Sequence, residues 1–367
     1  MQRFSLRFII PVTLLCFVAA TVQAADGPKK PEELAAKAIE YLRTTGQAAD
    51  GSYSAASGPG VTAIVTTGIL RHGRSPDDPL VAKSLKYLES FIHDDGGIYK
   101  EGSNHKNYET CLAVLCFSEA NKDGRYAKAL KAADAFLKGE QWDESEGKSK
   151  GDVEYGGAGY GGKKRPDLSN TQFFVDALRA TGNDEKSEAV QRALVFISRC
   201  QNLESENNTT PFAAKNPDGG FYYTPAGGGD SMAGKTESGG LRSYASMTYA
   251  GLKSMIFAGV GKDDQRVKAA VKWLQKNYDL KSNPGMADAG LYYYYHTFAK
   301  ALSALGEDTF VDESGVKHDW RQELVSELAA RQKENGSWAN SNQRWMEGDA
   351  NIVTGYALLA LSYCHKK

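Results

Sequence analysis

The chain has 367 residues, of which 41% are hydrophobic and 24% charged, and its formal net charge is −1. This composition excludes a disordered tail protein and a collagen-like fibre, and it lacks the strongly basic character of a nucleic-acid-binding domain. The only long apolar run lies at the N-terminus, which excludes a polytopic membrane protein. We therefore expect a globular protein with no nucleic-acid partner.

The first 24 residues have the pattern of a secretory signal. Arg3 and Arg7 precede an apolar stretch from Phe8 to Ala20, and Val22-Gln23-Ala24 places small residues at positions −3 and −1 of a cleavage site. The stretch is shorter than the ~20 residues that cross a bilayer. We predict a signal peptide at 1–24, a single mature domain at 25–367, a secreted or periplasmic location, and no membrane span after cleavage.

Beyond Cys16, the chain has four cysteines: Cys111, Cys116, Cys200 and Cys364. An exported protein could oxidise them, but Cys111 and Cys116 are five apart in an apolar helical run, which turns them about 140° away from each other. We predict buried free thiols. With no CxxC motif or Cys/His cluster, we expect no metal site and no cofactor.

From residue 39 onward the chain repeats one unit six times. Each copy has a helix with one apolar face, a Gly-rich turn with an aromatic residue, and a second, more uniformly apolar helix. In copy two, for example, Val81, Leu85 and Leu88 lie on one helix face before the turn Asp95-Gly96-Gly97. The six turns lie at 50–53, 95–99, 155–160, 218–222, 289–292 and 335–338, and the second helices at 61–70, 108–117, 171–179, 244–255, 296–305 and 352–361.

A one-faced helix has a neighbour on one side and water on the other, whereas a helix that is apolar all round is enclosed. The pattern therefore predicts an all-α fold, an (α/α)6 toroid of six outer–inner helix pairs. An open solenoid is the alternative, although its ends would need polar capping repeats. Long inserts at about 139–170 and 202–243 each join an outer helix to an inner one, so we expect both at the same end of the toroid.

The repeats resemble the terpenoid cyclase and protein prenyltransferase superfamily. Gln332, followed after three residues by Gly336-Ser337-Trp338, matches the end of its QW repeat, and Asp218-Gly219-Gly220-Phe221 is the same turn in another copy. The resemblance implies an isoprenoid or other apolar ligand in a central cavity. The Asp-x-Asp-Asp acid of squalene-type cyclases and the Asp-Asp-x-x-Asp metal motif are both missing. His296 matches the zinc-binding His of prenyltransferases, but the Asp and Cys ligands are absent, so we predict no metal.

Residues at the junctions between turns and inner helices are the candidates for a site. We predict His296 as a general base oriented by Asp288 or Glu237, with Tyr292 also catalytic. We assign ligand binding to Tyr244, Tyr295, Trp338, Trp345 and Asp349, although Asp349 also fits a helix cap. Other polar residues at the same junctions are His105, Glu109, Asp167, Asn170, Gln172, Arg242, Glu347 and Asn351.

Three classes of function stay open. An apolar aromatic cavity would favour an isoprenoid-binding or -converting protein, and a polar groove with paired carboxylates a polysaccharide lyase, hydrolase or glycan-binding toroid. In that second class, sugar rings would stack on rim aromatics: Trp142, Tyr155, Tyr160, Trp338 and Trp345. A filled core would favour a non-catalytic interaction scaffold. The residues do not decide whether the chain is an enzyme, and we expect a monomer.

Overall fold

The computed structural model describes residues 29–365, which form an all-α protein with thirteen α-helices and one two-stranded hairpin. The predicted signal peptide and Cys16 lie outside the described residues. Five helices bury one face: α1 Pro31–Tyr41, α3 Pro79–Glu89, α5 Ala127–Glu140, α10 Gln265–Lys276 and α12 Trp320–Arg331. The outer helix α7 Glu188–Arg199 departs from this pattern, since nine of its twelve residues are buried. Six are more fully enclosed: α2 Gly60–Arg71, α4 Lys106–Ala120, α6 Leu168–Ala180, α9 Ala245–Phe257, α11 Leu291–Leu305 and α13 Ala350–Leu361. The remaining elements are short: α8 Pro211–Lys215, β1 Phe310–Val311 and β2 Lys317–His318.

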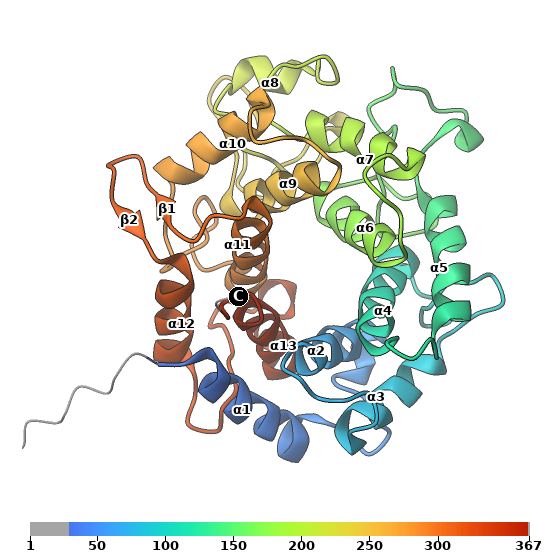
Figure 1. The fold of residues 1–367 in the computed structure, drawn as a ribbon. Coiled ribbons are helices and arrows are strands. Elements are labelled where there is room, and N and C mark those ends of the chain that lie inside the picture. Colours follow the sequence, from blue (N-terminus) through green and yellow to red (C-terminus); the bar gives the residue numbers. More distant parts are fainter. Residues whose placement is uncertain (1–28, 366–367) are drawn as a thin grey trace, which may run out of the picture.

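The enclosed helices contact one another in succession. Contacts join α2 to α4, then α6, α9, α11 and α13, and α13 in turn contacts α2 (Figure 1). In α2, eleven of the twelve residues are buried. The outer helix α3 instead buries a stripe that includes Val81, Leu85 and Leu88, as its spacing predicts.

A threonine of the inner helix holds the turn in five of the six copies. Its Oγ1 accepts the backbone N–H of the apolar residue that follows the turn glycines, at N···O distances of 2.9–3.1 Å. The pairs are Thr62 with Tyr53, Thr110 with Ile98, Thr171 with Ala158, Thr248 with Phe221 and Thr354 with Trp338. This bond fixes the rotation of each of these inner helices about its own axis.

The turn of copy six packs against the first helix of the chain. Gly336 has φ 88°, and a Cβ built on it would lie 2.3 Å from the backbone oxygen of Lys37 in α1. Gln332 donates from Nε2 to the backbone oxygens of Leu34 and Gly336, both at 2.9 Å. Gln332 and Gly336 therefore join the last copy to the first.

Copy five departs from the pattern. Its inner helix α11 begins at Leu291, inside the predicted turn and five residues before the predicted helix at 296–305. Gly290, with φ 68°, precedes the helix, and a carboxylate oxygen of Glu347 accepts the N–H groups of Tyr292 and Tyr293 at 2.9 Å. The cap comes from another loop, which short-range patterns do not reveal.

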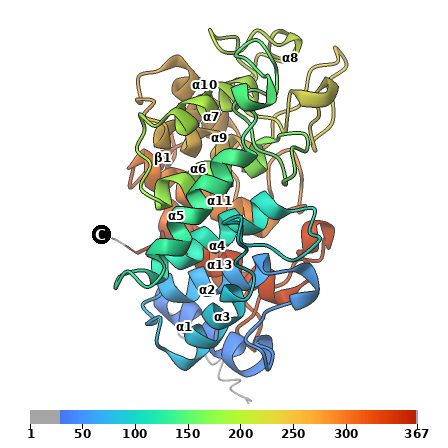
Figure 2. The same cartoon turned by 90° about the vertical axis from the view of Figure 1, so that its right-hand side faces the viewer.

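The four cysteines of the described residues are free and buried, as predicted. Among residues 29–365, no helix is both long and apolar enough to cross a membrane. In Figure 2 the inserts at 139–170 and 202–243 extend from the same side of the molecule, the side on which the inner helices begin.

Candidate functional site

A cavity of about 280 Å³ lies where the inner helices begin. All six inner helices contribute residues from their first two turns or from the position just before them, and four connecting segments complete the wall. Eight aromatic residues line it: Tyr108, Tyr160, Phe173, Tyr223, Tyr244, Tyr293, Trp345 and Tyr356. Aliphatic and thioether side chains fill most of the remainder: Val61, Ile64, Met232, Met247, Met346 and Ile352.

The aromatic wall packs edge to face across four helices. Tyr108 of α4 lies 5.6 Å from Phe173 of α6, and Tyr293 of α11 lies 5.9 Å from Tyr356 of α13, measured between ring centroids. The hydroxyls of Tyr108 and Tyr356 meet at 3.4 Å. T-shaped pairs of this kind add stability beyond the burial of their area, so the wall is preorganised rather than loose.

A single positional signal accounts for much of the lining. Residues two positions apart on an α-helix point about 200° away from each other. The residue two positions before each anchoring threonine therefore points away from the turn and toward the centre of the ring of inner helices. Every residue at this position lines the cavity: Gly60, Tyr108, Ser169, Ser246 and Ile352. The sequence contains this two-residue spacing, but only the hydrogen bonds between each threonine and the turn show which side of the inner helix faces the cavity.

Two carboxyl side chains face the cavity, and both are buried. Glu109 accepts the backbone N–H of Lys100 and the hydroxyl of Ser103, each at 2.8 Å. Glu347 caps α11 and also accepts from Nδ2 of Asn340 at 2.6 Å. Burial raises the pKa of both groups.

A third carboxyl, Asp167, lies just behind the wall. It caps α6 by accepting the N–H of Asn170 at 2.9 Å, and it is hydrogen-bonded to Tyr223, so two lining residues touch it. Burial raises the pKa of Asp167 to about 6.

We expect replacement of Asp167 by Asn to change how stability depends on pH. A carboxyl whose folded pKa is raised stabilises the fold fully below its unfolded pKa near 4, and that contribution is lost as the pH rises through about 6. A rise of about two units corresponds to about 3 kcal/mol. Asn caps helices as well as Asp does.

The free energy of unfolding, measured with urea at pH 4 to 7, should therefore rise for Asp167→Asn relative to the original chain by up to about 3 kcal/mol across this range. Parallel pH profiles for the two proteins would contradict the burial of an ionised Asp167.

Beneath the cavity, a polar chain leads to a buried ionic cluster. Nε2 of Gln172 donates to the hydroxyl of Tyr293 at 3.4 Å, and Oε1 of Gln172 accepts from Nζ of Lys253 at 2.7 Å. Asp176 pairs with Lys253 at 2.7 Å and with Lys300 at 2.5 Å. These cations lie in the C-terminal halves of α9 and α11, where helix dipoles favour positive charge.

Two residues with strained backbones, both partly exposed, lie at the mouth of the cavity in the loop before α13. Trp345 and Met346 are consecutive residues with φ of 55° and 65°, in the region that side-chain-bearing residues rarely adopt. The guanidinium of Arg344 lies 4.2 Å from the centroid of the Trp345 ring and donates to Sδ of Met232, across the mouth, at 3.5 Å. Such strain is most common at ligand clamps and switch regions.

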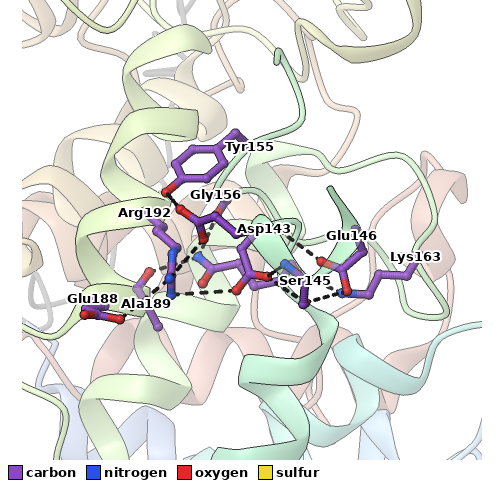
Figure 3. A network of polar contacts seen from close by, with 11 residues as sticks. Asp143, Ser145, Glu146, Tyr155, Gly156, Lys163, Glu188, Ala189 and Arg192 are labelled. Atoms are coloured by element: carbon purple, nitrogen blue, oxygen red, sulfur yellow. Dashed lines mark hydrogen bonds and ion pairs between the residues drawn. The ribbon is translucent and has the colours of Figure 1, made fainter. Parts of the chain in front are cut away.

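The first insert is tied to the next copy by ion pairs. Arg192 of α7 pairs with Asp143 at 3.7 Å and with Glu144 at 3.0 Å, and Lys163 pairs with Glu146 within the insert at 2.6 Å (Figure 3). The carbonyl oxygen of Tyr160, also in the insert, accepts the backbone N–H groups of Asn107 and Tyr108 at the start of α4.

Of the nine residues to which the sequence assigned catalysis or ligand binding, two line the cavity: Tyr244 and Trp345. Four of the further junction residues also line it: His105, Glu109, Asn170 and Glu347. Tyr292 and Tyr295 are buried away from it, since the hydroxyl of Tyr295 donates to Leu280 O and its ring packs on Tyr292. Trp338 is fully buried, and its indole donates to Leu328 O, so it is no platform for a sugar. Asp349 caps α13, the alternative role it was given.

The structure does not bring His296, the predicted general base, together with Asp288 or Glu237. His296 is buried one turn below the wall, 6.0 Å from the Tyr356 ring, and burial lowers its pKa well below the usual value. Its Nδ1 has no partner, and within residues 29–365 no hydrogen bond or ion pair joins it to Asp288 or Glu237, which are both exposed. Sequence reasoning missed most of the wall, including Tyr108, Phe173, Tyr293 and Tyr356.

No protein-family model and no curated protein matches the chain. In the described part of the chain, no group of three or more His, Cys, Asp or Glu side chains is arranged to hold a metal ion.

Proposed function

We propose that the chain is an exported, monomeric (α/α)6 toroid, a single domain over 25–367, that binds a small and largely apolar ligand. The succession of inner-helix contacts, and the bonds from Gln332 and Gly336 to α1, support the toroid. Its resemblance to the terpenoid cyclase and prenyltransferase superfamily favours an isoprenoid or another apolar molecule.

One observation carries the binding proposal. Eight aromatic side chains and six aliphatic or thioether ones from all parts of the chain converge on one cavity. Concave, mostly apolar sites with a few placed polar groups are the usual form of small-molecule sites. An interaction scaffold would fill this volume with its own side chains.

The glycan alternative has less support. Of its five rim aromatics, Trp338 and Tyr155 are buried, and Lys148 and Lys163 lie over the ring of Trp142 at 5.5 and 6.0 Å. Tyr160 and Trp345 line the cavity, among other aromatic residues rather than along a polar groove.

We expect replacement of Met247 by Trp to abolish ligand binding, because the larger side chain occupies the cavity. The control is Met247→Leu, which keeps similar volume. The measurement has two parts: fluorescence titration with the neutral dye Nile red, and native mass spectrometry of each protein purified from its own compartment, with lipid extraction alongside.

A co-purifying apolar molecule, and a dye signal, should both be present in the original chain and in Met247→Leu but absent in Met247→Trp. Equal dye binding by all three proteins would contradict a ligand in the cavity. A melting temperature raised only by oligosaccharides would support the glycan reading instead.

A further inference from the structure

The carboxyls around the cavity differ from the other buried acids of the described residues. The buried acids are Glu109, Asp167, Asp176, Glu327 and Glu347. Asp176 pairs with Lys253 and Lys300, and Glu327 with Lys281 and Arg331. Glu109, Asp167 and Glu347, which are the three at the cavity, have no ion pair with any Lys or Arg in residues 29–365.

Burying a carboxylate without a counter-charge is costly, so proteins normally pair such groups or bind a cation beside them. Hydrogen bonds satisfy part of the need here: Glu109 and Glu347 accept backbone and side-chain N–H or O–H groups, and Asp167 accepts from Asn170. Among residues 29–365, no Lys or Arg lines the cavity, and the one basic side chain in the lining is His105.

The positive ends of the helix dipoles at the cavity do not outweigh the negative charge of these carboxyls. Six termini contribute about half a positive charge each, or about +3 in all. Four carboxyls lie at those termini: Asp349 at α13, Asp167 at α6, Glu347 at α11 and Glu109 in the first turn of α4. Asp349 does not line the cavity, but when all four carboxyls are ionised their charge of about −4 exceeds the roughly +3 of the six termini, so the ring of helix N-termini around the cavity is net negative.

The remaining wall is made of aromatic rings, whose faces attract cations. The chain itself uses this attraction at the mouth, where Arg344 lies 4.2 Å from the centroid of the Trp345 ring. A metal ion does not suit such a wall, because carboxylates, imidazoles or thiolates would have to converge on it. An organic cation does suit it.

We propose that the ligand of this cavity is an organic cation, an amine or quaternary ammonium group carried on an apolar body, for which Glu109, Glu347 and Asp167 supply the counter-charge and the tyrosine rings the contact surface. This inference rests on the proposed function, since it names the ligand class of the same cavity. It distinguishes the chain from a protein for isoprenoid diphosphates, whose phosphates would need basic residues.

The test compares three probes on the full mature chain at pH 7.5 by isothermal titration calorimetry. Benzyltrimethylammonium is the cation, neopentylbenzene is its neutral isostere with carbon in place of nitrogen, and geranyl diphosphate is the anion. We expect the cation to bind at least about tenfold more tightly than the isostere, because several desolvated ring faces contact it. In Glu109→Gln, the amide oxygen can still accept the N–H of Lys100 and the new NH2 can donate to the hydroxyl of Ser103, so the fold is kept while the charge is removed, and that preference should fall several-fold.

The matched control is Glu313→Gln, which removes an exposed carboxylate elsewhere and should keep the preference. Equal or tighter binding of the isostere, tightest binding of geranyl diphosphate, or a preference unchanged in Glu109→Gln would each overturn the cation inference while leaving a ligand-binding cavity. If no probe binds and Nile red binds the original chain and Met247→Trp equally, the cavity proposal itself fails, and the inference fails with it.

Discussion

Replacing Asp176 by Asn should lower the free energy of unfolding by about 3–5 kcal/mol, because it leaves two ammonium groups in the interior without a counter-charge. The side chain of Asp176 is 1% exposed, and those of Lys253 and Lys300 are 2% and 9% exposed. Burial would raise the pKa of Asp176, yet the two ammonium groups hold it below its usual value. Urea unfolding at pH 7, followed by circular dichroism, measures the loss.

The control is Lys253→Met, which keeps the length of the side chain and leaves one carboxylate facing one ammonium group. Burial lowers the pKa of Lys253 to about 7, so this lysine is only weakly held in its charged form at neutral pH. We expect Lys253→Met to cost less than Asp176→Asn, since Asp176 keeps Lys300 as its partner and no buried charge is left without a counter-charge. A loss below about 1 kcal/mol for Asp176→Asn would show that the lysines are neutral or solvated in the fold.

Replacing Gly336 by Ala should cost about 3 kcal/mol, the sum of a left-handed backbone and a clash with backbone atoms. Gly336 has φ 88°, and the new Cβ would meet the backbone oxygen of Lys37 at 2.3 Å. Because Lys37 belongs to α1, the variant weakens the contact between the last copy and the first. Urea unfolding measures the effect.

Gly315 provides the matched control. Its φ is 85°, but a Cβ there meets nothing within 4 Å. Gly315→Ala should therefore show the backbone contribution alone, about 1 kcal/mol. If both variants lose the same stability, the contact between Gly336 and α1 contributes nothing, and the closure of the repeats depends on side-chain packing.

The helices could be predicted because their signals are local. Apolar spacing identified the outer and inner helices, and Asp349 caps α13, the role that its position before the last inner helix suggested. The buried state of Cys111 and Cys116 followed from their positions in an apolar helix. Each of these features depends on residues within a few turns of one another, so a repeat pattern is enough to predict them.

The site depended on helix rotation, which the sequence did not reveal. Successive residues of α11 point about 100° apart, so only one of its four tyrosines, Tyr293, lines the cavity. His296 is three residues later and lies below the wall, beside Tyr356. To choose correctly among the four tyrosines, one must know which side of α11 faces the cavity, and the sequence does not show this. The start of α11 is set by a cap from Glu347, which is more than fifty residues away in the chain.

The sequence by itself therefore determined the all-helical architecture, the repeated turns and the free thiols, because hydrophobic periodicity and capping act over short distances. Only the tertiary structure decided which side chains share the cavity, and that three buried carboxyls there have no ionic partner within residues 29–365 while Asp176 has two. Burial and pairing depend on groups brought together from distant copies, and the energy of a charge depends on all of its neighbours at once.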